Sequence, residues 1–284
     1  KKVRVLQLLC SQQQSLPPPI MANLLLCLLL AVFGLLIPHP AAAIGTNYLL
    51  SGQTLDTDGH LKNGDYDFIM QDDCNLVLYN GNWQSNTANR GRDCKLTLTN
   101  FGELLIKKAD GSTVWSSGSK SSKGEYATVV HPEGKVVVYG PAIFKINPWV
   151  PGHSGLKLGN IPRTANMLFS GESLYEDGKL IARNHQLVMQ GDCNLVLYGG
   201  KYGWQSNTHG NGQHCFLRLN HRGELIIKDD AFNTVWNSGQ NSGEGDYVFI
   251  LQDNGFGVVY GPAIWSTSSK GSMEKAIGMV TEAK

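Results

Sequence analysis

The sequence predicts an all-β protein made of two tandem domains. Short runs with alternating apolar residues recur along the chain, and clusters of Gly, Asn and Asp separate them, as is typical of strands joined by turns. A segment of about 100 residues also occurs twice. The chain has 284 residues, 33 of them glycine, with 42% hydrophobic residues and a net charge of +1. These values are ordinary for a globular protein, and the length allows about two domains.

The N-terminal region, residues 1–43, has the pattern of a secretory signal peptide. Met21 is followed by an apolar run over residues 24–37, by two prolines and by three alanines that end at Ala43, which suits signal cleavage. The apolar run is too short to cross a membrane comfortably, so a membrane anchor is the weaker alternative. We expect cleavage near Ala43, no membrane insertion, and an extracellular or vacuolar location. Residues 1–20 are either upstream sequence or an extended n-region.

The cysteines agree with passage through the secretory pathway. Two of the six cysteines fall in residues 1–43, which we do not expect to belong to the folded domains. This leaves Cys74, Cys94, Cys193 and Cys215, one pair in each repeat. The cysteines of the first pair are 20 residues apart and those of the second pair 22, which suggests one disulfide within each repeat. A metal site would need more ligands at short spacing, and no such pattern occurs.

The two repeats align closely along their length. Residues 47–52 match residues 166–171 at an offset of 119, which holds through the segment that ends at Tyr198. After a two-residue insertion near residues 200–202 the offset becomes 121, and residues 139–143 then match residues 260–264. Duplication of a whole domain explains this pattern.

A polar row recurs in the most similar part of the repeats. In β conformation every second side chain points to the same side, so this row lies opposite the apolar residues Leu76 and Leu78. Its amides, carboxylate and phenol offer both donors and acceptors, as vicinal sugar hydroxyls require, and its valine can lie against the C–H face of a sugar. The alternative is a solvated strand face, and the identity of all five positions in both copies argues against it. The row comprises Gln71, Asp73, Asn75, Val77 and Tyr79 in the first repeat and Gln190, Asp192, Asn194, Val196 and Tyr198 in the second.

The pattern Gln-x-Asp-x-Asn-x-Val-x-Tyr resembles the mannose-binding signature of the monocot, or bulb-type, lectins, and the tandem layout is similar to the two-domain aroid tuber agglutinins. The resemblance covers about residues 45–266. It implies that Asp73 and Asn75 contact the 2-hydroxyl of mannose, Gln71 the 3-hydroxyl and Tyr79 the 4-hydroxyl, with Val77 on the ring. The corresponding residues of the second repeat would do the same.

The resemblance also implies the architecture. Each domain would be a type II β-prism, with three four-stranded antiparallel sheets around a core of aromatic residues. By this expectation the cores use Trp83, Trp115 and Phe144 in the first domain and Trp204, Trp236 and Trp265 in the second. Surface tryptophans that stack on sugar are the alternative interpretation.

Each prism would carry two further rows, which are degenerate here. None of them keeps the Asp and Asn pair, and an unmatched polar group in a sugar pocket costs about 1–3 kcal/mol. We therefore expect one strong site in each domain and poor binding at the other four rows. The degenerate rows are Thr99, Phe101, Glu103, Leu105, Lys107; His131, Glu133, Lys135, Val137, Tyr139; Asn220, Arg222, Glu224, Ile226, Lys228; and Gln252, Asn254, Phe256, Val258, Tyr260.

The predicted organisation follows from these assignments. Lectin domains are expected over residues 44–147 and 166–266, joined by a linker over residues 148–165 that is rich in Pro and Gly. Such a linker is a natural processing site, so we expect a two-chain heterodimer that self-associates further, with an uncut linker as the alternative. Residues 267–284 are expected to be disordered or trimmed.

Other functions have less support in the sequence. The near-zero net charge and scattered basic residues do not favour nucleic acid as a partner, and no catalytic motif or cofactor motif occurs. The three histidines His209, His214 and His221 lie close in sequence and make a metal site the alternative interpretation, but the neighbouring Cys215 is assigned to the disulfide. The leading hypothesis is a secreted, non-enzymatic lectin for mannose glycans, with storage or defence as its role. The alternative is a storage or protein-binding module, like a protease inhibitor, with vestigial sugar sites.

Overall fold

The computed structural model describes residues 47–147, 150–151, 166–199 and 202–267. The predicted signal peptide, most of the linker and the C-terminal tail lie outside these residues. The chain divides into two units, Lys1–Ile44 and Gly45–Lys284, and the described residues all belong to the second. Every regular element described is a β-strand, which confirms the all-β prediction. Within this described part, no helix is long and apolar enough to cross a membrane.

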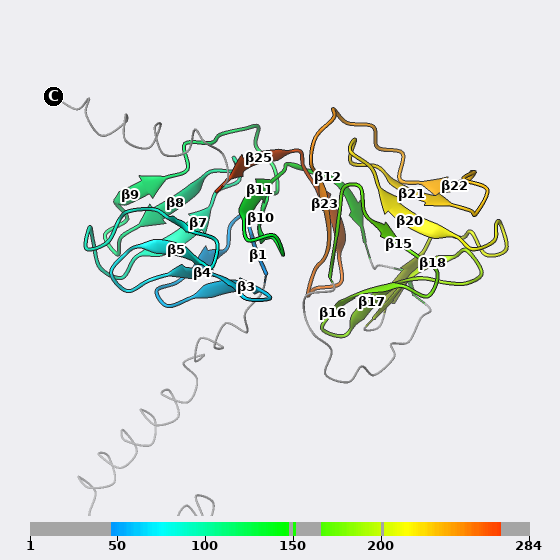
Figure 1. Cartoon of the computed structure of the whole chain (residues 1–284), viewed down its shortest axis with the longest axis horizontal. Coiled ribbons are helices and arrows are strands. Elements are labelled where there is room, and N and C mark those ends of the chain that lie inside the picture. The colour runs from blue at the N-terminus through cyan, green and yellow to red at the C-terminus, as the bar shows by residue number, and fades with distance from the viewer. Residues whose placement is uncertain (1–46, 148–149, 152–165, 200–201, 268–284) are drawn as a thin grey trace, which may run out of the picture. The chain divides into compact units, whose positions relative to one another are not determined.

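The first prism contains three four-stranded antiparallel sheets (Figure 1). One sheet has the order β3-β4-β5-β6 and carries the polar row of the first repeat. The second has the order β2-β7-β8-β9, and the third has the order β1-β10-β11-β25. The strands are β1 (Tyr48–Leu50), β2 (Thr54–Leu55), β3 (His60–Asn63), β4 (Tyr66–Met70), β5 (Leu76–Tyr79), β6 (Trp83–Gln84), β7 (Lys95–Leu98), β8 (Leu104–Lys107), β9 (Thr113–Ser116), β10 (Ala127–Val130), β11 (Val136–Tyr139) and β25 (Ala263–Ser266).

The second prism repeats this plan with one addition. Its sheets have the orders β13-β19-β18-β17-β16, β15-β20-β21-β22 and β12-β24-β23-β14. The first of these has five strands instead of the predicted four, because Val150–Pro151 of the predicted linker pairs with β19. The strands are β12 (Ala142–Ile146), β13 (Val150–Pro151), β14 (Met167–Phe169), β15 (Ser173–Leu174), β16 (Lys179–Ala182), β17 (His185–Met189), β18 (Leu195–Gly199), β19 (Tyr202–Gln205), β20 (Phe216–Leu219), β21 (Leu225–Lys228), β22 (Thr234–Asn237), β23 (Val248–Leu251) and β24 (Gly257–Tyr260).

Alternation along the strands places the core inside each prism. On β5, Leu76 and Leu78 are buried, whereas Val77 is half-buried and Tyr79 is exposed. The same alternation on β8 buries Leu104 and leaves Leu105 on the outer face. A strand with one buried face has a fixed register, because a shift by one residue would turn every apolar side chain outward.

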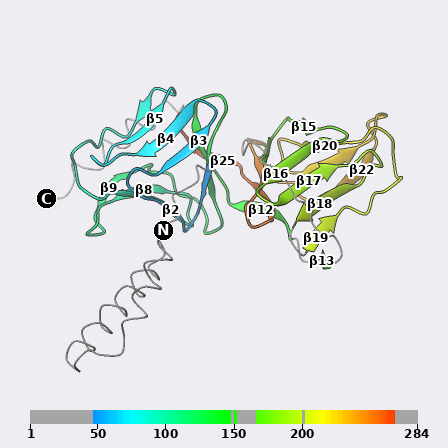
Figure 2. The ribbon, with the colours of Figure 1, turned by 90° about the horizontal axis from the view of Figure 1, so that it is seen from below.

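The prisms exchange their last strands, which corrects the predicted aromatic cores. Strand β25, from the end of the second repeat, pairs with β11 of the first prism, and β12, from the end of the first repeat, pairs with β24 of the second (Figures 1 and 2). Trp265 therefore packs with Trp83 and Trp115, at ring-centroid distances of 5.8 and 6.2 Å. Phe144 lies in the second core instead, 6.4 Å from Trp236.

The two sheets that receive exchanged strands also pack against each other. All four residues of β10, β11, β23 and β24 are buried, so these strands have no face open to solvent. An apolar cluster of residues from both repeats, including Val129 and Ile250, fills the contact. At one edge the Nδ2 of Asn47 donates to the Oδ1 of Asn166, its equivalent in the other repeat, at 3.1 Å. A residue that meets its own counterpart is the mark of a two-fold-like interface.

Candidate functional site

The polar row spans a turn and a strand, which refines the prediction of one continuous strand. Gln71 to Asn75 form a tight turn after β4, closed by the N–H of Gln71 donating to the Asn75 carbonyl at 2.9 Å, and only Val77 and Tyr79 lie on β5. Cys74 has φ 70°, in the left-handed region, and Cys193 has φ 69° in the second repeat. This backbone twist breaks the alternation between Gln71 and Asn75.

The ends of each row are joined by a hydrogen bond. The Nε2 of Gln71 donates to the hydroxyl of Tyr79 at 2.8 Å, and Gln190 makes the same 2.8 Å bond to Tyr198. Tyr79 is 46% exposed, so the row of the first repeat is open to solvent at this end. The two copies therefore share one hydrogen-bonded frame.

The carboxylate and the second amide of the row are held by the backbone and by β6. The Oδ1 of Asp73 accepts from the N–H of Asn75 at 2.8 Å, which leaves Oδ2 as its second acceptor oxygen. Asn75 is buried, with its Oδ1 accepting from Ser85 and Thr87 and its Nδ2 donating to Gln84. A side-chain amide has two N–H donors, and the described residues accept one of those of Asn75. The second N–H is therefore available to donate to a ligand.

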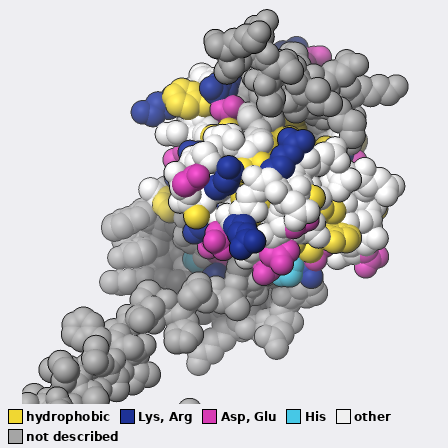
Figure 3. All heavy atoms as spheres, turned by 90° about the vertical axis from the view of Figure 1, so that its left-hand side faces the viewer, with side chains coloured by type: hydrophobic (Ala, Val, Ile, Leu, Met, Phe, Trp, Pro, Cys, Tyr) yellow, Lys and Arg dark blue, Asp and Glu magenta, His cyan; other side chains and the backbone are white. Residues whose placement is uncertain are grey.

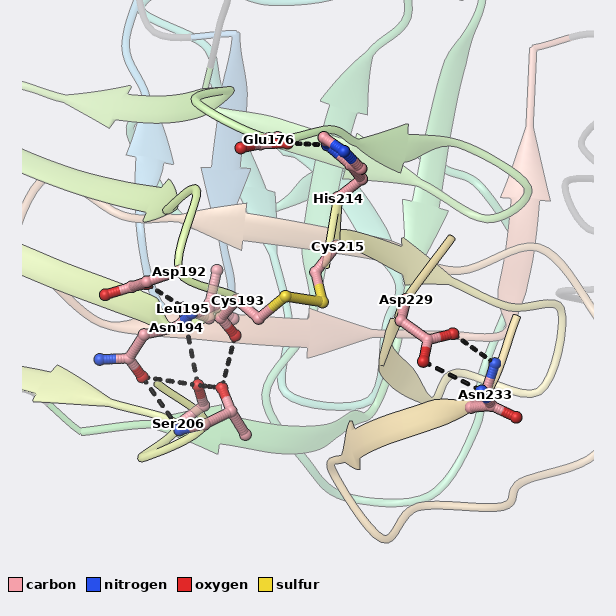
Figure 4. The surroundings of a disulfide bond; sticks show 11 residues. Glu176, Asp192, Cys193, Asn194, Leu195, Ser206, His214, Cys215, Asp229 and Asn233 are labelled. Carbon is pink, nitrogen blue, oxygen red and sulfur yellow. Dashed lines mark hydrogen bonds and ion pairs between the residues drawn. A yellow bond between two sulfur atoms is a disulfide. The ribbon is translucent and has the colours of Figure 1, made fainter. Parts of the chain in front are cut away.

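The supporting residues were not predicted as part of the site. Gln84, Ser85 and Thr87 belong to the segment Trp-Gln-Ser-Asn-Thr, which is identical in the second repeat. There Ser206, Thr208 and Gln205 make the same contacts with Asn194. Figure 4 shows the bond between Ser206 and Asn194. The identity of this whole segment in both repeats is the signal in the sequence that points to these residues.

The second row differs at its carboxylate. Besides the Asn194 N–H at 2.9 Å on Oδ1, Asp192 accepts at Oδ2 from the Nδ1 of His209 at 2.7 Å. Burial works against ionisation of Asp192, but the hydrogen bonds from His209 and the backbone outweigh it and hold its pKa below the ordinary value. Ala88 occupies the position of His209 in the first repeat. Val196 is also buried, at 2% exposure, whereas its counterpart Val77 is half-buried.

Both predicted disulfides are present. Cys74 pairs with Cys94 and Cys193 with Cys215. Each bond ties the turn of its polar row to the residue just before a strand of the neighbouring sheet, β7 in the first repeat and β20 in the second. Figure 4 shows the second of these bonds. The disulfides thus fix the backbone between the Asp and the Asn of each row.

Two of the four degenerate rows are buried at both ends, although their middle residues Glu133 and Asn254 are exposed. His131 and Tyr139 of the first repeat, and Gln252 and Tyr260 of the second, are each 6% exposed or less, because their sheets pack against each other. They still keep the bond that joins the ends of a row, 2.7 Å from Gln252 Nε2 to the Tyr260 hydroxyl. Burial thus adds a second reason, beyond the changed residues, to expect no sugar there.

The other two degenerate rows lie on exposed sheets but carry different chemistry. In the first repeat Glu103 stands where the polar row has Asn, and it accepts from Ser116 and pairs with Lys120. In the second repeat Arg222 stands where the row has Asp, and it pairs with Glu244 at 3.5 Å. In the second repeat the Nδ2 of Asn220 also donates to Glu224 at 3.2 Å, but neither row has a carboxylate at the Asp position together with an amide at the Asn position.

His131 makes stability depend on pH. Burial, with a smaller effect of Lys135, lowers its pKa from 6.5 to about 4, and its ring lies 4.3 Å from that of Phe169 of the other repeat. Between these pH values the unfolded chain binds a proton that the folded protein does not. Stability is therefore expected to fall by about 3 kcal/mol as the pH drops from 6.5 to 4.

Urea unfolding at pH 7 and pH 4.5 measures this loss. His131→Gln installs the residue that the second repeat has at this position, Gln252, and should remove this part of the pH dependence. An equal loss of stability in wild type and variant would contradict the assignment.

The three neighbouring histidines do not share a ligand. His209, His214 and His221 each face a different carboxylate, those of Asp192, Glu176 and Asp246. Among the described residues, no group of three His, Cys, Asp or Glu side chains is arranged to hold a metal ion. On the face in Figure 3, charges of both signs are interspersed.

Tandem β-prisms with a repeated polar row define the class of two-domain lectins. No family model matches the sequence. The chain is 71% identical to mannose-specific lectin CEA of Colocasia esculenta, over 93% of this chain and all of that protein. It is 73% identical to mannose-specific lectin 1 of Remusatia vivipara, over 89% and 99% of the two chains. The chain therefore belongs to the monocot mannose-binding lectin family.

A solved structure supports the two-domain architecture. The fetuin-binding Scilla campanulata agglutinin, a two-domain lectin, matches with a TM-score of 0.70 and 32% identity, over 78% of this chain and 99% of that one. Lectins bind carbohydrate without transforming it, so the chain is not an enzyme. These relatives favour the lectin hypothesis over a storage or protein-binding module.

Proposed function

We propose that the protein binds α-linked mannose at two sites, the rows Gln71–Tyr79 and Gln190–Tyr198. The observation that carries this proposal is the hydrogen-bonded frame common to both rows, in which Asp and Asn lie side by side between a Gln and a Tyr. A carboxylate that only accepts, next to an amide with an N–H to donate, suits a hydroxyl that does both.

A column of immobilised mannose tests this proposal. We expect the intact protein to be retained and to elute with methyl α-mannoside but not with methyl β-galactoside. Passage through the column without retention, together with no binding to mannosides on a glycan array, would contradict it.

His209 is expected to weaken the second site. A sugar hydroxyl at Asp192 must share Oδ2 with His209 or displace it. In the first repeat Ala88 stands at the position of His209, so this position offers no imidazole to Asp73. Because exposed ion pairs contribute little, His209→Ala should raise affinity at the second site only about twofold to fivefold. Titration of methyl α-mannoside into this variant on an Asp73→Ala background measures it, and Ala88→His should weaken the first site. Unchanged affinity in both variants would show that His209 does not compete.

We also propose that the linker is cleaved and that the two chains remain associated. The strand exchange supports this, since each prism keeps the last strand of the other repeat after a cut between residues 152 and 165. Several sites in one particle, and further self-association, would raise avidity for branched glycans and cause agglutination.

Limited proteolysis checks the association. The cut protein should elute as one particle in native gel filtration, yet separate into two bands in SDS without reductant, because both disulfides lie within a repeat. Separation of the fragments under native conditions would contradict the proposal.

For location, we propose the secretory pathway, with an extracellular or vacuolar destination. The signal-like pattern that ends at Ala43 and the two disulfides support this. N-terminal sequencing of the protein from its native tissue tests it, and a mature chain that still begins before Met21 would contradict it.

A further inference from the structure

Three aromatic side chains form a cluster on the second repeat, outside the polar row. Tyr175 follows β15, Phe216 begins β20, and Phe232 lies in the turn between β21 and β22. The ring of Phe216 is 5.7 Å from that of Tyr175 and 5.9 Å from that of Phe232. Tyr175 is 68% exposed and Phe232 69%, while Phe216 beneath them is 9% exposed. Single exposed apolar residues are common on proteins, but a contiguous group indicates a binding surface.

The first repeat shows that the fold does not require this cluster. The equivalent positions there hold Asp56, Lys95 and Gly111, and the Nζ of Lys95 forms an ion pair with Asp56 at 3.0 Å. The same strands and turn thus exist with a charged, soluble surface. The aromatic residues of the second repeat are therefore not needed to form these strands and this turn.

The backbone conformation of Phe232 also suggests a functional role for its side chain. Its φ is 62°, in the left-handed region that bulky residues avoid, and the first repeat has Gly111 there at φ 83°. Asp229 holds the turn, since its Oδ1 accepts from the Asn233 N–H at 2.7 Å and its Oδ2 from the Asn233 side-chain amide at 3.0 Å (Figure 4). A phenyl ring kept exposed at a strained position is a feature typical of functional sites.

The cluster adjoins the turn of the second polar row. Glu176, next to Tyr175, pairs with the Nδ1 of His214 at 3.0 Å (Figure 4). Its Oε1 also lies against Gly191, where a Cβ would come within 2.7 Å. Gly191 stands between Gln190 and Asp192, so the segment that carries Tyr175 touches the backbone of the row.

A covalent link makes the second connection. Cys215, directly before Phe216, is bonded to Cys193, which stands between Asp192 and Asn194 (Figure 4). In the first repeat Asp72 replaces Gly191 and Thr57 replaces Glu176, with Thr57 bonded to the Cys94 carbonyl instead. The contact between Glu176 and Gly191, which joins the aromatic cluster to a polar row, is thus specific to the second repeat.

We propose that Tyr175, Phe216 and Phe232 form an extended carbohydrate subsite, which takes the inner pyranose residues of an oligomannoside whose terminal mannose occupies the Gln190–Tyr198 row. Pyranose rings present an apolar C–H face that packs on aromatic rings, and the tyrosine hydroxyl adds a polar group at the rim. This inference rests on the proposed function, because it extends one of the two sites. It makes the repeats unequal, with the second suited to longer glycans.

The test exchanges the cluster for the chemistry of the first repeat. The triple variant Tyr175→Asp, Phe216→Lys, Phe232→Gly is made on an Asp73→Ala background, so that only the second site reports. Methyl α-mannoside and a branched mannopentaose are titrated calorimetrically into this variant and into Asp73→Ala alone. Phe101→Ala, which removes an exposed ring of the first repeat, is the matched control.

We expect the triple variant to bind the pentaose about tenfold more weakly, as the loss of aromatic contacts implies, and the monosaccharide within twofold of its parent. Phe101→Ala should change neither. Unchanged pentaose affinity, or an equal loss for both sugars, would overturn the subsite; unchanged affinity with dissociation of a larger particle in sedimentation would assign the cluster to self-association. If Asp73→Ala and the wild type both fail to bind either sugar, the proposed function itself fails.

Discussion

Replacing Asp73 and Asp192 by alanine together is expected to abolish retention of the protein on immobilised mannose. In the proposed sites each carboxylate offers an acceptor oxygen to the ligand. Each also holds its own turn, because its Oδ1 accepts from the N–H of Asn75 or Asn194. A hydrogen bond to a charged group is worth about 1.5–3 kcal/mol, which amounts to a loss of tenfold or more at each site. Shallow sites of this kind bind single sugars weakly, so such a loss takes binding below detection.

Two controls make this result specific. Asp72→Gly introduces the residue that the second repeat has at this neighbouring position, Gly191, and should leave retention unchanged. The single variants Asp73→Ala and Asp192→Ala should each retain one working site and lower avidity only. Full retention of the folded double variant, with unchanged circular dichroism, would refute the assignment of these carboxylates.

Trp265→Ala is expected to destabilise the first prism, although residue 265 belongs to the second repeat. Its indole is 7% exposed and meets Trp83 at 5.8 Å and Trp115 at 6.2 Å, edge to face. Removing a buried tryptophan costs about 3–5 kcal/mol, since a large cavity remains. Because β25 pairs with β11, the loss should appear in the sheets of the first repeat.

Hydrogen exchange resolved by peptide measures where the loss occurs. In Trp265→Ala, protection should fall first in β4 and β5, whereas in Phe144→Ala it should fall first in β17 and β18. Phe144 is partly exposed, so its effect should be the smaller. The opposite pattern, with Trp265→Ala loosening β17 and β18, would mean that each repeat keeps its own last strand.

The strand exchange could not be predicted from the sequence, for a physical reason. Residues 139–143 and 260–264 are identical, Tyr-Gly-Pro-Ala-Ile, so the entry to the last strand is the same in both repeats. Either strand can satisfy the open edge of either prism, and local propensity does not choose between them. The choice depends on tertiary packing, which no short pattern encodes.

The burial of the two degenerate rows that contain His131 and Gln252 is indicated by the sequence of neighbouring strands. Val136–Tyr139 and Val248–Leu251 are continuous apolar runs, without the alternation seen at Leu76–Tyr79. Such a run is typical of a strand covered on both faces. The rows containing His131 and Gln252 are therefore closed at their ends by packing, in addition to lacking the Asp and Asn pair.

The strongest local patterns gave the most reliable predictions. Alternation predicted the buried leucines of β5, and the cysteine spacing predicted both disulfides. What alternation missed was the turn at Gln71 to Asn75, since the left-handed Cys74 changes the direction of the side chains. The pairing of His209 with Asp192 could not be predicted either, because His209 begins a stretch in which the two repeats differ at most positions.

A crystal of the protein soaked in methyl α-mannoside tests the central claim most directly. Two sugars per chain are expected, one with its hydroxyl within hydrogen-bond distance of Asp73 and Asn75 and one beside Asp192 and Asn194. Electron density for sugar only elsewhere on the surface, with both of these rows empty at saturating concentration, would contradict the account.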